Sequence, residues 1–260
     1  MNLYSFDEEN HIHKRCGKPL IGTTTSLEII AKPLVWWASG MCAGVFGWLN
    51  SKKHDLNERL VAAGEMLTNI KLMTIKEYLD LLDKAYKAHN AKKEARAKEG
   101  TDLHALAEEY VRQKMAGIEP LFVHEKLKAF VSWCDVNVKR FLFCEIHCYS
   151  EKLWVGGKTD IGFEMFNGDY VLSDIKSRDQ DYFTDHVQCG GYDIQITENG
   201  EGYDKDGNVI WKMDRPFNRH AIFTLGDKFK EPIFSKSVEA NKQNFIHAVG
   251  LYKGKQEFEQ

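Results

Sequence analysis

The 260-residue sequence predicts an α/β fold, with a central mixed β-sheet flanked by helices and a helical N-terminal region. Up to Val138 the apolar residues recur mainly at helical spacing, and from Phe141 they form short runs separated by turn residues. Helices followed by three strands, a helix, a strand and a closing helix are the order of an α/β or α+β domain. We expect residues 1–99 to pack as a helical region on a core of residues 100–260.

In the N-terminal region, apolar spacing predicts helices over Leu56–Leu67 and Thr74–Ala97. Gly100 should end the second of these, and Thr101 or Asp102 should cap a new helix that continues to Tyr110. The later elements follow from the same patterns: a helix over His124–Val138, strands over Phe141–Ser150, Trp154–Met165 and Asp169–Lys176, a helix over Phe183–Thr197, a polar excursion over Glu198–Pro216, a strand over His220–Leu225 and a helix over Ser235–Tyr252.

Composition excludes several classes of protein. With 43% hydrophobic and 28% charged residues, the chain is neither disordered nor fibrous. A net charge of −3 argues against a protein that binds nucleic acid through a general basic excess. Between Lys84 and Lys98, however, six Lys and Arg gather, which is typical of a solvated helix face or of a surface that follows phosphates.

The compartment is expected to be the cytoplasm. Six cysteines without a CxxC pair predict reduced thiols, and the acidic N-terminus is not a signal peptide. The uncharged segment 33–51 is at the lower length limit for a membrane span. Its Pro33, Ser39, Asn50 and three glycines favour a buried, Trp-rich helix instead, so we expect no membrane attachment.

The sequence places its most informative polar residues on adjacent predicted strands. Asp174 and Lys176 end an apolar strand, on one face because side chains alternate with a period of two. Burying both charges there is costly unless they serve a site. The preceding strand brings Asp160 close. If Asn167-Gly168 formed a two-residue turn, Asp160 would pair with Ile175. A three-residue loop with Gly168 left-handed would instead pair it with Asp174, as a shared metal site requires.

Two helical positions complete the candidate set. Gln188 and Tyr192 share a helix face because they are four residues apart, and His104 falls in the first turn of its predicted helix. Each is weak evidence alone, since helical His and Tyr residues more often serve packing.

Together these residues resemble the PD-(D/E)xK nuclease superfamily, in its RecB-like exonuclease branch. The similarity covers roughly residues 100 to 195. The matching parts, in order, are Gly100-Thr101-x-x-His104, Glu145, Gly157-Lys-Thr-Asp160, Asp174-Ile-Lys176 and Gln188-x-x-x-Tyr192. Thr23-Thr-Thr-Ser and the residues after it more loosely resemble phage-encoded members. Asp174 stands where Glu is commoner. The last cysteine is Cys189, so no C-terminal iron–sulfur cluster is expected.

The resemblance implies a divalent-metal-dependent DNA exonuclease that acts on DNA ends or single strands during phage or bacterial replication, recombination or repair, in the host cytoplasm if phage-encoded. Mg²⁺ or Mn²⁺ would be held by His104, Asp160, Asp174 and the Ile175 carbonyl; the nitrogen ligand favours Mn²⁺. Glu145 would be a further metal-side carboxylate or a structural partner. Lys176 would orient or help deprotonate the attacking water, Gln188 would position Lys176 or the nucleophile, and Tyr192 would contact a phosphate.

Other functions remain open at this point. The chain could be a structure-specific or restriction-like endonuclease, or a non-catalytic DNA-binding protein that keeps the fold. An acidic centre neutralised by cations predicts weak, salt-sensitive and metal-dependent DNA binding despite the net charge of −3. Cleavage polarity, strand preference and oligomeric state do not follow from the sequence.

Overall fold

The computed structural model describes residues 3–30, 35–120, 123–226, 229 and 231–259, without the side chains of residues 35–37, 89 and 91–102. The chain divides into two compact units: Met1–Ala31 with Gly100–Gln260, and Lys32–Glu99. The division at residue 100 matches the expected boundary. Residues 1–31, however, belong to the larger unit, so the expected helical region of residues 1–99 is reduced to Lys32–Glu99.

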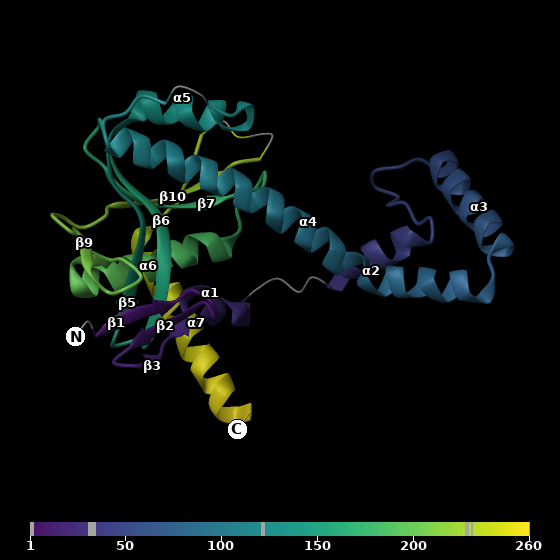
Figure 1. Cartoon of the computed structure of the whole chain (residues 1–260), viewed down its shortest axis with the longest axis horizontal. Coiled ribbons are helices and arrows are strands. Elements are labelled where there is room, and N and C mark those ends of the chain that lie inside the picture. Colours follow the sequence, from purple (N-terminus) through teal and green to yellow (C-terminus); the bar gives the residue numbers. More distant parts are fainter. Residues whose placement is uncertain (1–2, 31–34, 121–122, 227–228, 230, 260) are drawn as a thin grey trace. The chain divides into compact units, whose positions relative to one another are not determined.

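The larger unit contains an eight-stranded mixed sheet with the order β11-β10-β7-β6-β5-β8-β9, and β4 pairs with β6 (Figure 1). Its centre is the antiparallel group β5, β6 and β7, and β7 pairs in parallel with β10. The strands are β4 (Ile21–Gly22), β5 (Val138–Ser150), β6 (Val155–Met165), β7 (Tyr170–Lys176), β8 (Glu201–Tyr203), β9 (Val209–Lys212), β10 (Arg219–Thr224) and β11 (Ile233–Phe234). The α/β class and the three central strands predicted from the sequence are confirmed.

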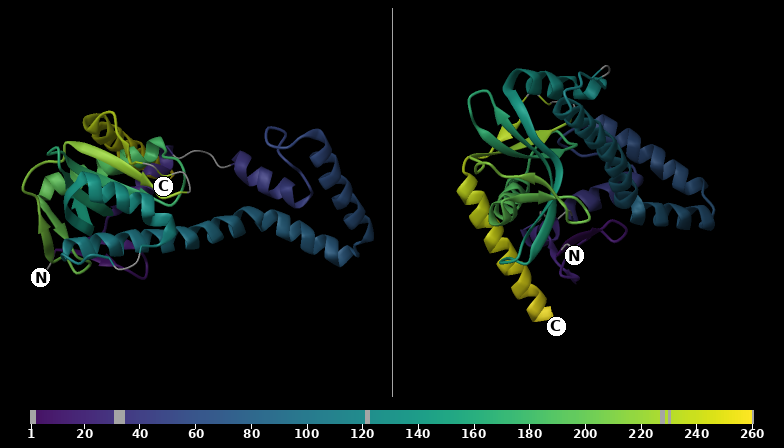
Figure 2. Two further views of the ribbon diagram at one scale, coloured as in Figure 1. Left: turned by 90° about the horizontal axis from the view of Figure 1, so that it is seen from above. Right: turned by 60° about the vertical axis from the view of Figure 1, so that its left-hand side comes forward.

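Helices cover both faces of this sheet. The C-terminal part of α4 (Ile75–Met115) and α5 (Lys128–Asn137), which follows a 3-10 turn at Glu125–Leu127, pack on one face, around Phe130 and Phe163. Helices α6 (Phe183–Asn199) and α7 (Val238–Glu259) lie against each other on the other side, as the green and yellow helices in Figure 2 show. The site residues of β6 and β7 therefore lie between two helical layers.

The first residues of the chain are strands, which the helical prediction for this region missed. Strands β1 (Tyr4–Asp7), β2 (Ile12–Arg15) and β3 (Lys18–Pro19) form a small separate sheet. The short helix α1 (Thr23–Ser26) and a 3-10 turn at Leu27–Ile30 follow. Tyr4 stacks on Tyr149 of β5, with ring centroids 5.3 Å apart, so aromatic packing against the main sheet fixes this hairpin.

Helix α4 is continuous over 41 residues, which corrects the expected break at Gly100. Neither Thr101 nor Asp102 begins a helix, and His104 lies in the interior of α4 rather than in a first turn. A glycine inside a helix costs only about 1 kcal/mol relative to alanine, and the Ala, Lys, Glu and Arg residues around it are strong helix formers. Helix α4 contributes residues to both units.

The smaller unit contains α2 (Val35–Val45), α3 (Leu56–Leu72) and the first part of α4. A capping box between Asp55 and Glu58 begins α3. The expected burial of tryptophans in segment 33–51 is wrong for Trp48, which is 47% exposed, and the side chains of Trp36 and Trp37 lie outside the described residues. Within the described ranges, the structure contains no helix with the length and apolar character needed to cross a membrane.

Helices α6 and α7 approach so closely that two glycines are required where they cross. A Cβ at Gly190 would overlap the backbone of Asn241, and one at Gly191 would overlap the ring of Phe245. The Gly190-Gly191 pair therefore lies inside α6 for packing reasons, and it keeps Gln188 and Tyr192 on a regular helix.

We expect Gly190→Ala to lower the free energy of unfolding by roughly 1–3 kcal/mol, because the added methyl group must displace backbone. Urea denaturation would measure the change. In the control variant Gly254→Ala, where no atom lies within 4 Å of the added Cβ, stability should stay the same or rise by up to about 1 kcal/mol. Equal stability of Gly190→Ala and the native chain would contradict the close packing.

A buried histidine pair joins the N-terminal hairpin to β5. His13 of β2 and His147 of β5 have ring centroids 5.6 Å apart, and Nδ1 of His13 lies 2.5 Å from the hydroxyl of Tyr4. Burial, together with His147 and Lys158, lowers the pKa of His13 to about 3. Burial and Lys158 lower the pKa of His147 to about 4. Both imidazoles are therefore neutral in the folded protein at pH 7.

This pair should make stability fall in mild acid. Below an unfolded-state pKa of about 6.5, the unfolded chain binds protons that the folded chain does not, so the free energy of unfolding decreases as pH falls from 6.5 towards 4. Each histidine contributes up to about 1.4 kcal/mol per pH unit. The free energy of unfolding would be measured by urea denaturation at several pH values in this range. It should change less with pH in His147→Phe than in the native chain. An unchanged pH dependence of the free energy of unfolding in His147→Phe would refute the assignment.

Candidate functional site

The turn between β6 and β7 sets the register of the candidate site. Gly168 has a φ of 89°, Gly168 N–H donates to the Met165 carbonyl, and Met165 N–H donates to the Asp169 carbonyl. The connection is thus a three-residue loop, and Ile161 pairs with Ser173. Continued by one residue, this register puts Asp160 opposite Asp174. The bulged loop predicted from the sequence is confirmed, and the alternative pairing of Asp160 with Ile175 is excluded.

Asp160 lies where the β6–β7 ladder ends. Beyond the Ile161–Ser173 pair, its Oδ2 accepts the backbone N–H of Ile175 at 2.6 Å. The carboxylate thus replaces a backbone acceptor at the point where the two strands separate, and Asp160 is only 8% exposed. On the other side, the β5–β6 register of Cys144 with Ile161 and Ile146 with Thr159 sets Glu145 opposite Asp160. Glu145, Asp160 and Asp174 therefore follow one another across three adjacent strands.

His104 reaches this row from helix α4. Its Nε2 lies 3.1 Å from Oδ2 of Asp160, and its Nδ1 lies 2.5 Å from Oε1 of Glu108 on the next turn of the helix. Burial disfavours the imidazolium, but the hydrogen bonds to Asp160 and Glu108 outweigh it and raise the pKa of His104 to about 10. Burial would likewise raise the pKa of Asp160, yet the hydrogen bond from His104 lowers it. A protonated His104 thus provides positive charge between two carboxylates.

On the other side of Asp160, a chain of polar contacts runs from β7 into helix α6. Lys176 Nζ lies 2.6 Å from Oδ2 of Asp174 and donates to Oε1 of Gln188 at 3.2 Å. The Gln188 amide in turn donates to the hydroxyl of Tyr192 at 2.7 Å. Asp174 is 2% exposed and Tyr192 is 4% exposed. Gln188 therefore contacts Lys176 as the sequence suggested, while the Tyr192 hydroxyl lies behind Gln188.

Charge in this part of the site is not fully compensated. Burial raises the pKa of Asp174 to about 7; Lys176 opposes this shift and Asp160 adds to it. Burial also disfavours the ammonium of Lys176, but Asp174 and Asp160 together raise its pKa. Apart from the imidazolium of His104, which Asp160 shares with Glu108, Lys176 is thus the cation that the described residues set against these two buried carboxylates.

Glu145 belongs to a second set of contacts. It lies 2.5 Å from Nζ of Lys158 and 2.9 Å from Nη2 of Arg112, with its backbone left-handed at a φ of 52°. Burial and a side-chain contact with Glu108 raise the pKa of Glu145. Among the described residues, the one group of three that could hold a metal ion is His104, Glu108 and Glu145. This group includes two of the expected ligands, adds Glu108, and lacks Asp160 and Asp174.

Two contributions to the site were missed from the sequence. Glu108 carries a sequence signal, because it follows His104 by four residues and so must share its helix face. Thr23 carries none. Its hydroxyl donates to the Gly156 carbonyl and accepts from the Gln195 amide, and a Cβ at Gly157 would overlap both Thr23 and Tyr192. The N-terminal Thr23–Ser26 turn thus packs directly behind Tyr192.

A cavity of about 170 Å³ lies beside Gln188. It is lined by Thr24, Leu27, Glu28, Thr184 and Gln188. The N-terminal segment and helix α6 therefore together form an open hollow next to the Lys176–Gln188 contact.

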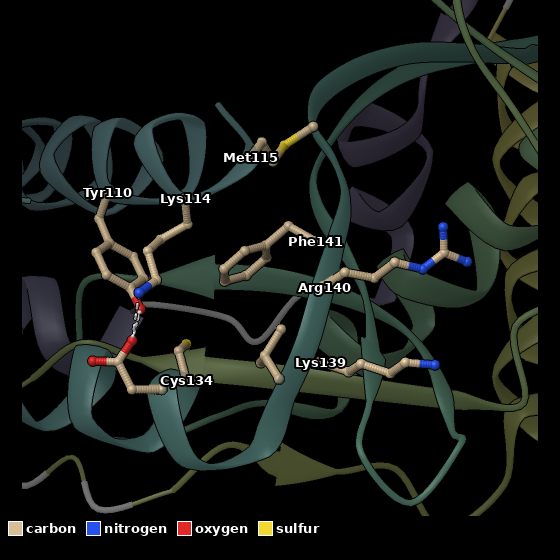
Figure 3. A pocket seen from close by; sticks show the side chains of 9 residues that line it. Tyr110, Lys114, Met115, Cys134, Lys139, Arg140 and Phe141 are labelled. Carbon is tan, nitrogen blue, oxygen red and sulfur yellow. Dashed lines mark hydrogen bonds and ion pairs between the residues drawn. The ribbon is translucent and has the colours of Figure 1, made fainter. Parts of the chain in front are cut away.

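A larger cavity lies elsewhere, at the start of β5, and measures about 310 Å³ (Figure 3). In it, Tyr110 donates to Asp135, and Lys114 lies 3.1 Å from the same carboxylate. Figure 3 shows the Lys139 and Arg140 side chains extending away from Tyr110 and Lys114. Its inward-facing charges are already paired, and it contains none of the candidate site residues.

The basic run on α4 is described only in part. Lys84 and Lys87 are exposed, while the side chains of Lys92, Lys93, Arg96 and Lys98 lie outside the described residues. Whether this run serves DNA stays a prediction.

Comparison with known proteins adds no relatives: no family model and no curated protein sequence matches this chain. Function must therefore be argued from the site itself.

Proposed function

We propose that this chain is a divalent-metal-dependent nuclease that hydrolyses phosphodiester bonds of DNA, and that it acts as an exonuclease with a PD-(D/E)xK core. One observation carries the proposal. The antiparallel strands β6 and β7 place Asp160, Asp174 and Lys176 together where their ladder ends, in contact with His104 and Gln188. These are the residue types and the order in which the RecB-like branch arranges its site.

The donor set suits a hard divalent cation. Asp160, Asp174 and the Ile175 carbonyl offer the oxygen ligands that Mg²⁺ and Mn²⁺ prefer, and His104 would add the nitrogen that favours Mn²⁺. The electrostatics agree, since the cations that the described residues place beside these two buried carboxylates are Lys176 and the imidazolium of His104. A cation here would replace the proton of His104 as the source of positive charge. When bound, it would neutralise phosphate charge and lower the pKa of a coordinated water.

The remaining chemistry falls to the protein's own groups. Lys176 holds its ammonium at the edge of the carboxylate pair, where it would orient the attacking water and stabilise charge on the phosphate in the transition state. Gln188 fixes the position of Lys176 through its side-chain oxygen, and Tyr192 fixes Gln188 in turn. The proposed role of Tyr192 is therefore support of Gln188 in place of direct phosphate contact.

Lys176→Ala and Asp174→Asn should each reduce DNA hydrolysis by roughly 100-fold or more, because the first removes the ammonium that would orient the attacking water and the second removes a proposed ligand of the cation. Release of acid-soluble nucleotides from linear DNA in Mn²⁺ would measure this. Asp174→Asn keeps the size of the side chain, so circular dichroism should show an intact fold. Lys255→Ala, at an exposed position of α7, is the matched control and should retain full activity. Unchanged hydrolysis by both site variants would sink the proposal.

A circular single-stranded substrate separates the exonuclease from the endonuclease alternatives. An exonuclease needs an end, so we expect linear DNA to be degraded while the circle persists under the same conditions. Cleavage of the circle at a similar rate would replace the proposal with an endonuclease. Binding to both substrates without cleavage of either, in Mg²⁺ and in Mn²⁺, would leave the non-catalytic DNA-binding alternative.

A further inference from the structure

Both ring nitrogens of His104 face a carboxylate. Nε2 lies 3.1 Å from Asp160, and Nδ1 lies 2.5 Å from Glu108. A cation could therefore use His104 in two ways, either through Nε2 together with Asp160 or through Nδ1 together with Glu108 and Glu145. The two are mutually exclusive for a neutral imidazole, because one nitrogen binds the cation while the other carries the proton.

Local charge decides between them. Glu108 and Glu145 already face two protein cations: Arg112 Nη2 lies 2.9 Å from Glu145 and 3.7 Å from Glu108, and Lys158 lies 2.5 Å from Glu145. These carboxylates are compensated without a metal ion. Apart from His104 itself, the cation that the described residues place against Asp160 and Asp174 is Lys176, and both carboxylates are buried. The uncompensated charge therefore lies on the Nε2 side of His104.

The placement of Glu108 then has a specific consequence. With Nε2 directed at the cation, the proton of His104 must reside on Nδ1, and Glu108 is the acceptor that lies against it. A histidine ligand whose second nitrogen donates to a carboxylate is fixed in both tautomer and ring orientation, and it is a more basic ligand. Arg112 lies on the next turn of α4 and contacts Glu108 and Glu145 together, so it holds the acceptor in place.

We propose that Glu108 is a positioning residue that accepts a hydrogen bond from Nδ1–H of His104. This contact would direct Nε2 towards a divalent cation at Asp160 and Asp174. This role rests on the proposed function for the identity of the cation site. It implies that Glu108 and Glu145 support the site and do not themselves bind the cation. Glu108 is four residues from His104 on an unbroken part of α4, so a rigid helix sets the geometry of the contact.

The test measures metal binding and the state of the ring directly. Mn²⁺ affinity of the full chain would be obtained from the electron paramagnetic resonance signal of free Mn²⁺. The His104 tautomer would be read from long-range ¹H–¹⁵N correlations in the Mg²⁺-loaded protein. We expect one cation per chain and protonation of Nδ1. Glu108→Ala should weaken Mn²⁺ binding about 10- to 100-fold and remove the single Nδ1-protonated tautomer.

Two further variants separate positioning from fold. Glu108→Gln keeps an oxygen that can accept a hydrogen bond from Nδ1–H. It should therefore retain the Nδ1-protonated tautomer of His104 and most of the Mn²⁺ affinity. Glu109→Ala removes an exposed carboxylate from the adjacent position of the same helix and should leave both readouts unchanged. Equal Mn²⁺ affinity of Glu108→Ala and the native chain would overturn the positioning role. A second bound Mn²⁺ that Glu108→Ala and Glu145→Ala both abolish, with the first retained, would also overturn it, because the group would then be a cation site.

These outcomes are independent of the nuclease proposal. If the native chain hydrolyses no DNA, yet Glu108→Ala loses Mn²⁺ affinity and the Nδ1-protonated tautomer, the positioning role stands and the proposed function fails. If hydrolysis occurs and neither readout responds to Glu108, the proposed function stands and the positioning role fails.

Discussion

The hydrogen bond from Ile175 N–H to the Asp160 carboxylate is the interaction on which the candidate site depends. A backbone donor buried in a sheet must be paired, and at the end of the β6–β7 ladder the side chain of Asp160 supplies the acceptor. The strands can therefore separate without leaving an unpaired buried N–H group. The same carboxylate oxygen faces Nε2 of His104, so the group that satisfies the sheet also links it to helix α4.

The other half of the site depends on the packing of α6. Gly190 and Gly191 let α7 approach its backbone, and Asp193 of α6 lies 3.0 Å from the ring of His220 on β10 and 2.8 Å from Lys242 on α7. His220 and Asp193 are fully buried, so this network fixes α6 against both the sheet and α7. Gln188 is thereby held at the distance at which it meets Lys176. The helix positions the lysine, and the lysine compensates Asp174.

How much could be predicted from the sequence follows from the range of the interactions involved. The strands around Asp160 and Asp174, the left-handed Gly168 and the Gln188–Tyr192 helix face are set by local periodicity and turn chemistry, and each was predicted. The contact of Thr23 with Gly156 joins residues more than a hundred positions apart and leaves no local pattern. The first strands were missed for a related reason, because Tyr4 and His13 are stabilised by rings of β5 and β8 that lie far along the chain.

The prediction for helix α4 was wrong for the opposite reason, because it gave too much weight to a local signal. Gly100 predicts the end of a helix, but a glycine lowers helix stability by only about 1 kcal/mol, and packing of Leu103 and Ala107 against the sheet outweighs this cost. The continuous helix matters for the site. It sets His104, Glu108 and Arg112 on successive turns of one face, whereas the helix expected to continue to Tyr110 did not include Arg112.

Charge also has to be judged locally in this chain. A net charge of −3 over the whole sequence is nearly neutral, yet the cations nearest the site are already committed: Lys176 to Asp174, Arg112 and Lys158 to Glu145. Lys158 is therefore not a free cation for a phosphate. The imidazolium of His104 supplies positive charge between Asp160 and Glu108. Under the proposed function, a divalent cation that replaced that proton would give the site the excess positive charge that an anionic backbone requires.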